Sequence, residues 1–154
     1  LNNPEINRYL ETHWVEQTRS TIEIFLKEME KCNNSVLFGI FFDGKHVGNI
    51  KIGPVNWNHF YADVSYFIGD RNAWGQGLAT EAVSLVTRFG FERLGLNKCK
   101  AGVYSGNPGS CRVLEKVGYR KEGCLGNELK GPNGWEDHLL YGYSREDFLL
   151  NDKS

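Results

Sequence analysis

The 154-residue chain has no long hydrophobic run and no excess of charge of either sign. Its longest apolar run, Val36–Phe42, has the length of a buried strand, whereas a membrane-spanning helix needs roughly 18 apolar residues. Eighteen basic residues stand against nineteen acidic ones, so the charge favours neither nucleic acid nor an anionic membrane as a partner. With 40% hydrophobic and 13% aromatic residues, the composition also excludes a disordered chain.

The sequence also lacks closely spaced cysteines and histidines. No two cysteines form a C-x-x-C pair, which argues against a zinc ribbon or a redox motif, and a disulfide framework needs denser cysteines in a smaller chain. No two histidines have metal-ligand spacing, so we expect no bound metal. We expect free thiols in a cytoplasmic protein. The residues concerned are Cys32, Cys99, Cys111 and Cys124, together with His13, His46, His59 and His138.

What remains is a glycine-rich chain of the size of one domain. At ~150 residues per domain, residues 1–154 are predicted to form a single domain with a hydrophobic core. Because the chain begins with leucine instead of methionine, we expect the native protein to extend before Leu1.

Two N-terminal segments are predicted to be helices. In Pro4–Leu10 the apolar residues share one helical face. Ser20–Glu23 has the Ser/Thr-x-x-Glu pattern of a capping box. The apolar residues behind it follow the i, i+3, i+4, i+7 spacing of an amphipathic helix through Met29, and Asn33-Asn34 is expected to close it. These residues are Ile22, Phe25, Leu26 and Met29.

The rest of the chain is predicted to alternate between strands and helices. Asp43-Gly44 is a hairpin turn signal between two apolar segments. A helix is expected after the loop at residues 70–80, ending near Gly95, and a second from the Asn107-Pro108 cap to Gly118. The pattern indicates an α+β fold with one mixed, twisted central sheet flanked by helices. The expected strands are Val36–Phe42, His46–Ile52, Tyr61–Ile68, Lys98–Tyr104, Tyr119–Cys124 and Trp135–Tyr143.

The loop Gly75–Thr80 lies between an expected strand and an expected helix. Glycines let the backbone approach a ligand closely, and the N–H groups of a helix N-terminus bind phosphate. A P-loop is excluded because Gln76 stands where lysine is needed, and a Rossmann fingerprint would need glycine at Thr80. Two readings stay open on the loop alone, a pyrophosphate cradle for an acyl-carrier cofactor and a tight turn without a ligand.

Two motifs together resemble the GNAT acetyltransferases. Trp74–Ala82 is similar to the coenzyme A loop of that family, with Asn72 at the position that usually holds glutamine or arginine. The second motif resembles the N-x-x-S…E-K-x-G-F…E-G segment of the subgroup that acetylates ribosomal-protein N-termini, small amines and amino sugars. It consists of Asn107-x-x-Ser110, Glu115-Lys116-x-Gly118-Tyr119 and Glu122-Gly123.

The resemblance implies a GNAT domain whose first strand would precede Leu1, and an enzyme that takes acetyl from acetyl-CoA. It places the neighbouring strands Tyr61–Ile68 and Lys98–Tyr104 parallel, with carboxyl ends that splay apart. Leu114 stands where many members have a tyrosine acid, so Ser110 is expected to protonate the leaving thiolate. The residues implied to bind the cofactor are Tyr66, Phe67, Ile68, Arg71, Asn72, Gly75, Gln76, Gly77, Leu78, Ala79, Thr80, Asn107, Ser110 and Lys116.

The acceptor side is less sharply defined. Asp63 is expected to act as the general base, because the amine must lose a proton before it attacks the thioester. His59, Tyr61, Asp137 and His138 are expected to line the acceptor site. The resemblance favours a nucleotide-linked aminosugar for surface glycans, with a ribosomal-protein N-terminus or a polyamine as alternatives. A non-catalytic acyl-CoA-binding module and a homodimer also stay open.

Overall fold

The computed structural model of the chain describes residues 15–18, 22–30, 34–69, 75 and 77–152. The helix predicted over Pro4–Leu10 lies outside these residues. The strands are β1 (Val15–Thr18), β2 (Ile22–Glu30), β3 (Ser35–Phe42), β4 (Lys45–Asn56), β5 (Tyr61–Ile68), β6 (Lys98–Tyr104), β7 (Arg120–Gly131) and β8 (Gly134–Ser144). The helices are α2 (Leu78–Glu92), α3 (Pro108–Val117) and α4 (Arg145–Asp152).

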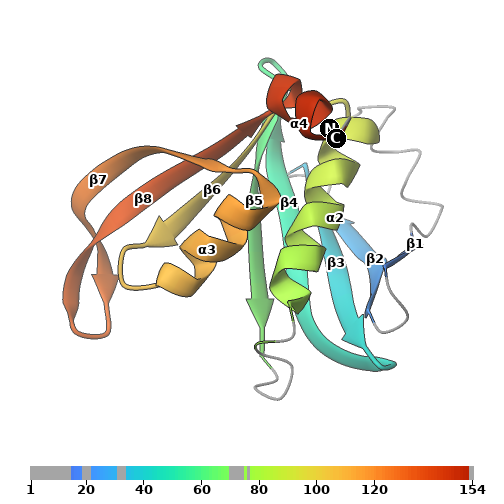
Figure 1. The fold of residues 1–154 in the computed structure, drawn as a ribbon, viewed down its shortest axis with the longest axis horizontal. Coiled ribbons are helices and arrows are strands. Elements are labelled where there is room, and N and C mark those ends of the chain that lie inside the picture. The colour runs from blue at the N-terminus through green and yellow to red at the C-terminus, as the bar shows by residue number, and fades with distance from the viewer. Residues whose placement is uncertain (1–14, 19–21, 31–33, 70–74, 76, 153–154) are drawn as a thin grey trace.

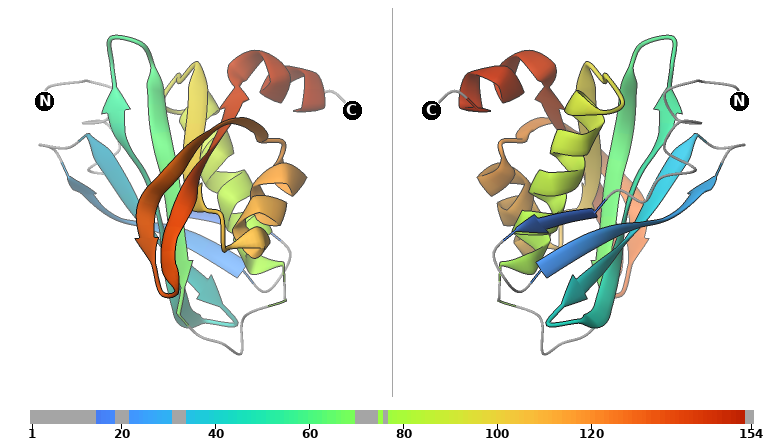
Figure 2. Two further views of the ribbon diagram at one scale, coloured as in Figure 1. Left: turned by 90° about the vertical axis from the view of Figure 1, so that its left-hand side faces the viewer. Right: turned by 90° about the vertical axis from the view of Figure 1, so that its right-hand side faces the viewer.

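The described strands form one mixed sheet in the order β1-β2-β3-β4-β5-β6-β8-β7 (Figure 1). Among them β5 and β6 are the parallel pair, and α2 connects them, since parallel neighbours cannot be joined by a tight turn. Helices α2 and α3 lie on one face of the sheet (Figure 2), which we call the helix face. The α+β class and the parallel pairing are therefore confirmed.

The helix predicted over Ser20–Met29 is wrong, because the structure has strand β2 in its place. Ile22, Ile24 and Leu26 are buried, which is the period-two pattern of a strand, and β2 pairs antiparallel with β3. The segment also fits a helical period, since Ile22, Leu26 and Met29 are spaced i, i+4 and i+7. Pairing with β3, together with the strand preference of β-branched isoleucines, decides the conformation.

The hairpin predicted at Asp43-Gly44 is confirmed. Both residues have positive φ, 52° and 78°, as in the two-residue turns that match the twist of antiparallel strands. The turn sets the register of β3 and β4 so that Ile50 and Ile52 are buried. Strand β4 runs on past its predicted end at Ile52, through an irregularity in its pairing with β5.

Helix α3 begins and ends as the sequence predicts. The side chain of Asn107 accepts a hydrogen bond from the Ser110 N–H at 3.2 Å, and Pro108 opens the helix. The helix stops at Gly118, whose φ is 130° and where an added Cβ would lie 2.6 Å from the ring of Tyr143. The position therefore requires glycine.

The remaining elements complete the core around α2. Its predicted apolar stripe is buried, including Ala82, Val83 and Phe89. Strand β7 is longer than predicted. Its pairing with β8 continues through two irregularities, beyond the predicted end at Cys124, up to the turn at residues 132–133. Helix α4 is not among the predicted elements. Its first turn is capped by the Ser144 hydroxyl, which accepts from the Asp147 N–H at 3.1 Å.

Candidate active site

The cleft between β5 and β6 arises because these strands pair only at their beginning. Their register runs from Tyr61 opposite Lys98 to Asp63 opposite Lys100 and then stops. Beyond that point β5 still pairs with β4, and β6 still pairs with β8, to their ends. Figure 1 shows the two strands diverging. The predicted splay is confirmed, and it leaves the facing backbone edges without a strand partner.

The open edge of β5 presents backbone donors to the cleft. The Gly69 N–H donates to the Val47 carbonyl of β4 at 2.9 Å, and the carbonyl of Phe67 also faces β4, close to Gly48. Because N–H groups alternate between the two edges of a strand, those of Tyr66 and Ile68 face the cleft. An amide-bearing ligand lying along β5 would satisfy them, and they are oriented to stabilise a carbonyl oxygen that gains negative charge.

Two hydroxyl groups meet across the cleft. Tyr66 of β5 and Ser110 of α3 approach to 3.0 Å between their oxygens, close enough for a hydrogen bond in either direction. Both residues line the cleft, whose volume is about 170 Å³, together with Leu114 and Asn107. Sequence reasoning gave Tyr66 only a cofactor contact and missed this pairing. The available signal was the alternation of β5, which puts Tyr66 on the same face as the buried Ala62 and Val64.

The glycine loop ends at the start of α2. Gly75 and Gly77 have φ values of 78° and 75°, and Gly77 is the N-cap without a side-chain hydrogen bond. An added Cβ at either position would meet nothing within 4 Å, so the requirement for glycine comes from the backbone conformation. The first-turn N–H groups of α2 are thus left for a ligand, which fits a pyrophosphate.

The other residues implied to bind the cofactor range from buried core positions to the exposed end of α3. Leu78 is buried and serves the core, and Ala79 and Thr80 are half-buried in the first turn of α2. Lys116 is exposed in the last turn of α3, about 9 Å along the helix from Ser110. The expected contacts at Arg71, Asn72 and Gln76 lie outside the described residues.

The candidate acceptor residues of strand β5 lie in its first half, where it pairs with β6. Asp63 is exposed and occupies the last paired position, opposite Lys100. Tyr61 begins the strand, and the ring of His59 stacks beside it at 6.4 Å in the preceding turn. Five to seven residues of ~3.3 Å each separate Tyr61 from the splayed end of β5. The structure therefore does not bring His59 and Tyr61 together with the cleft.

Strand β8 places Asp137 and His138 near the other wall of the cleft. The Asp137 carboxylate accepts from the Asn127 N–H of β7 at 3.0 Å, so it contacts the backbone of the hairpin. His138 lies opposite Tyr104 of β6, and its Nδ1 is 2.7 Å from Oε1 of Glu128. Glu128 is not among the residues singled out from the sequence, because an irregular stretch of β7 brings it there.

Buried hydroxyl and thiol groups around α3 stay neutral. Burial raises the pKa of Cys99 to about 12, with a hydrogen bond to Tyr119 opposing it. Burial, followed by the neighbouring Cys111 and Glu115, raises the pKa of Tyr141 above its usual range, and the Tyr141 hydroxyl donates to Glu115 Oε2 at 3.1 Å. None of these groups is among the residues that line the cleft.

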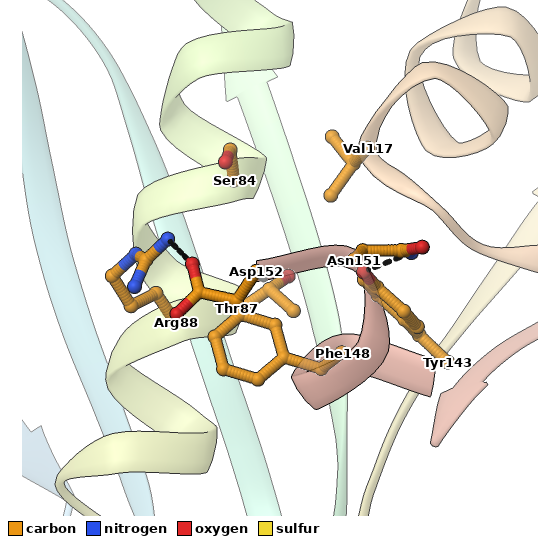
Figure 3. Close-up of a pocket in the computed structure, with 8 residues that line it drawn as sticks. All are labelled: Ser84, Thr87, Arg88, Val117, Tyr143, Phe148, Asn151 and Asp152. Atoms are coloured by element: carbon orange, nitrogen blue, oxygen red, sulfur yellow. Dashed lines mark hydrogen bonds and ion pairs between the residues drawn. The ribbon is translucent and has the colours of Figure 1, made fainter. Parts of the chain in front are cut away.

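A second pocket, between α2, α3 and α4, serves to attach α4 (Figure 3). Arg88 of α2 bonds Asp152 at 2.7 Å, and this contact holds the pKa of the Asp152 carboxyl below its usual value. The side-chain amide of Asn151 donates to the Tyr143 hydroxyl at 2.8 Å. The polar groups of this pocket are thus engaged with one another, away from the cleft.

Within the described ranges, no three His, Cys, Asp or Glu side chains gather closely enough to hold a metal ion. The same residues contain no helix with the length and apolar character needed to cross a membrane.

Residues 1–120 match the family model of the acetyltransferase (GNAT) domain. The chain is 37% identical over 129 residues to the probable N-acetyltransferase YjcK of Bacillus subtilis (strain 168), covering 82% of this chain and 70% of that protein. It is 34% identical over 130 residues to the uncharacterized N-acetyltransferase YoaA of the same organism, covering 81% and 72%.

Solved structures share the fold. One is a spermidine N-acetyltransferase from Vibrio cholerae in complex with CoA and spermine, with a TM-score of 0.71 at 22% identity over 77% of this chain and 70% of that one. Another is described as a probable acetyltransferase, with a TM-score of 0.77 at 19% identity over 87% and 98%. The solved structures show the fold alone, whereas the family match and the identity to YjcK show the family. The chain belongs to the GNAT family and is an acetyl-CoA-dependent N-acetyltransferase.

Proposed function

We propose that the enzyme acetylates the amine of a nucleotide-linked aminosugar, with Ser110 as the proton donor to the leaving thiolate. The observation that carries the acceptor proposal is the sheet face opposite α2 and α3, which we call the open face. There, exposed aromatic rings stand at the splayed ends of β5 and β6, and lysines lie on β2, on β4 and on the paired part of β6.

The aromatic rings stand at the ends of both diverging strands. Phe67 of β5 is 68% exposed and Tyr104 of β6 is 46% exposed, although both are large rings that a core would normally take up. The alternation of each strand puts them on the open face. Exposed rings at a pocket mouth give flat apolar surfaces against which a sugar ring packs.

Three lysines extend across the same face. Lys51 of β4 lies opposite Ser65, and Lys100 of β6 lies opposite Asp63 with its Nζ 4.8 Å from the ring centre of Tyr61. The aliphatic stem of Lys27 lies over Gly39 of β3, beside Asn49. Asp63 lies opposite Lys100 and Glu128 lies beside His138, so this face carries charges of both signs and is not the acidic surface that a polycation would favour. This supports an aminosugar acceptor over a polyamine. A polyamine is the class of substrate named for the Vibrio enzyme.

On the cofactor side we propose that the amides of Gly75 to Ala79 bind the pyrophosphate and that Asn107 holds the pantetheine arm. Ser110 then protonates the departing sulfur, with its hydroxyl oriented by Tyr66 at 3.0 Å. A thiolate with a pKa near ~8.5 needs only a weak acid, so a hydroxyl suffices. The remaining contribution of the protein is to align the amine with the thioester.

An acceptor screen tests the proposal. Release of free coenzyme A from acetyl-CoA is measured with a uridine-diphosphate-linked aminosugar, the same aminosugar without the nucleotide, a basic peptide with a free N-terminus, and spermidine. We expect the highest kcat/KM with the nucleotide-linked sugar and a lower value with the free sugar. A preference for the peptide or for spermidine contradicts the aminosugar proposal and identifies the alternative acceptor.

A further inference from the structure

His138 of β8 lies against the wall of the cleft. An added Cβ at Gly102 of β6 would collide with Nε2 of His138, so the imidazole rests directly over the β6 backbone at this glycine. Gly102 itself lines the cleft, next to Tyr104, which lies opposite His138 in the register. The ring nitrogen therefore lies on the open face, over a glycine that lines the cleft.

The partner of the imidazole fixes which nitrogen is free. Nδ1 of His138 lies 2.7 Å from Oε1 of Glu128, with the two side chains 27% and 46% exposed. A carboxylate can only accept, so Nδ1 carries the hydrogen and Nε2 is left with its lone pair. The same arrangement of carboxylate and imidazole orients catalytic histidines in unrelated enzymes.

A bulge in β7 places Glu128. The pairing of β7 with β8 shifts register between Leu125 and Leu129, and Asn127 within this stretch has a φ of 51°. The Asn127 N–H is held by the Asp137 carboxylate at 3.0 Å. Bulges redirect side chains and are frequent beside active sites. Asp137, expected from the sequence to contact the acceptor, here fixes the bulge that directs Glu128 toward His138.

We propose that Nε2 of His138 accepts the proton of the acceptor ammonium, with Glu128 as its positioning residue. An ammonium N–H bond breaks, the proton passes to Nε2, and the freed nitrogen lone pair forms the C–N bond to the acetyl carbon. As the C–S bond breaks, the sulfur takes the hydroxyl proton of Ser110. The new amide nitrogen loses its second proton, which restores the Ser110 hydroxyl through solvent, and the imidazolium returns its proton to solvent. This inference requires acetyl transfer to an amine but not the proposed aminosugar.

The charged and titratable groups that face this imidazole are few. Glu128 comes from β7, Tyr104 and Lys100 from the open face of β6, and Glu136 from two residues earlier on β8. Glu136 is engaged by the Gly106 N–H at 2.6 Å. Asp63, the base expected from the sequence, lies at the closed end of the cleft, opposite Lys100. His138 is thus better placed than Asp63 for the acceptor amine.

The pH dependence of kcat/KM tests the assignment in His138→Gln, Glu128→Gln and Asp63→Asn. The acceptor is the uridine-diphosphate-linked aminosugar, or spermidine if the screen selects it. His46→Gln is the matched control, since His46 also bonds a side-chain oxygen, Asn49 Oδ1 at 3.1 Å, but lies on β4, two strands away from β6. We expect His138→Gln to lower the rate about 10²- to 10⁴-fold and to abolish the acid limb.

The variant Glu128→Gln tests whether Glu128 positions the imidazole of His138 for catalysis or only stabilises the fold. The amide no longer supplies the carboxylate that accepts from Nδ1–H, so we expect kcat to fall while the KM for the acceptor, the acetyl-CoA affinity and the melting temperature stay unchanged. Asp63→Asn and His46→Gln should retain the limb. A limb that persists in His138→Gln overturns the proposal: its loss in Asp63→Asn then identifies Asp63 as the base, and its survival in every variant assigns it to the substrate amine.

Discussion

The two faces of the sheet differ where β5 and β6 diverge. On the helix face, Ser110 is fixed by a capped helix and a 3.0 Å contact with Tyr66, and the α2 N-terminus is shaped by glycines at positive φ. On the open face, the corresponding positions carry side chains that reach the surface, among them the exposed Phe67 and Glu128 and the half-buried Lys51 and His138. Backbone geometry defines the first face and exposed side chains define the second.

Under the proposed function, this difference separates the groups that bind the acetyl donor from the groups that select the amine. Backbone amides and a helix N-terminus bind phosphate and amide groups that every donor molecule presents, and they change little with surface substitutions. Exposed side chains on a rigid sheet can be exchanged without disturbing the core. We therefore expect substitutions on the helix face to act on all acceptors alike and substitutions on the open face to depend on the acceptor.

The largest effect on the helix face is expected from Ser110→Ala. Loss of a positioned proton donor costs about 10²- to 10⁴-fold in rate, so kcat should fall far more than coenzyme A affinity. Steady-state kinetics with calorimetry of coenzyme A binding separates the two, with Ser84→Ala on the exposed side of α2 as control. A fall in kcat of less than ~3-fold would show that another group, such as the Tyr66 hydroxyl, protonates the sulfur.

The helix face is also the part that the sequence predicts well. Strands β5 and β6 begin and end at their expected residues, and Asn107 caps α3 as its Asn-Pro signal indicates. These are local patterns, in which alternation and caps act over a few residues. The contact between Tyr66 and Ser110 joins residues 44 positions apart and depends on how α3 crosses the cleft, so no local pattern reveals it.

On the open face the decisive features are tertiary. Glu128 contacts His138 in a stretch where β7 departs from regular pairing. A prediction from strand alternation assumes regular pairing and therefore does not show on which face the Glu128 side chain lies. The wrong prediction of a helix behind the Ser20–Glu23 pattern has a related cause. The apolar residues of this segment fit both a helical and a strand period, and pairing with β3 decides between them. Helix α4 could have been found from its Ser144 cap followed by acidic residues.

A substitution at Gly102 probes the open face through a single methyl group. Gly102→Ala places a Cβ against Nε2 of His138, and displacing a catalytic group by about 1 Å can cost about 10²-fold in rate. Gly123→Ala is the matched control, because its Cβ would meet Leu140 at an ordinary 3.6 Å. We expect kcat/KM to fall in Gly102→Ala and to stay unchanged in Gly123→Ala, with coenzyme A affinity retained in both.

A double-mutant cycle establishes the cause of that loss. If Gly102→Ala acts by displacing the imidazole, adding it to His138→Gln should lower the rate little further, since coupled substitutions are not additive. Additive effects would mean that the methyl group obstructs the cleft directly, and that the packing of His138 on Gly102 has no part in catalysis.

Gly77→Val tests the donor cradle on the helix face. A β-branched residue at a φ of 75° costs about 1–3 kcal/mol in strain, and relief of that strain would withdraw the α2 amides from the pyrophosphate. We expect coenzyme A affinity to fall about 5- to 150-fold, as measured by calorimetry. Gly95→Val is the control, because Gly95 has a φ of 69° beyond the other end of α2. Equal coenzyme A affinity in the two variants would remove the cradle from the mechanism.

The smallest expected effect, and the most selective, comes from reversing charge on the open face. In Lys51→Glu a nucleotide-linked acceptor should lose about 3- to 10-fold in kcat/KM, since a partly exposed charge contributes modestly and is screened by salt. The same substitution should leave acetyl-CoA affinity unchanged and should raise kcat/KM with spermidine. Raising the salt concentration should narrow the gap between the variant and the parent, because the interaction is electrostatic. An equal loss of kcat/KM for anionic, neutral and cationic acceptors would mean that Lys51 stabilises the sheet and that the open face does not select acceptors by their charge.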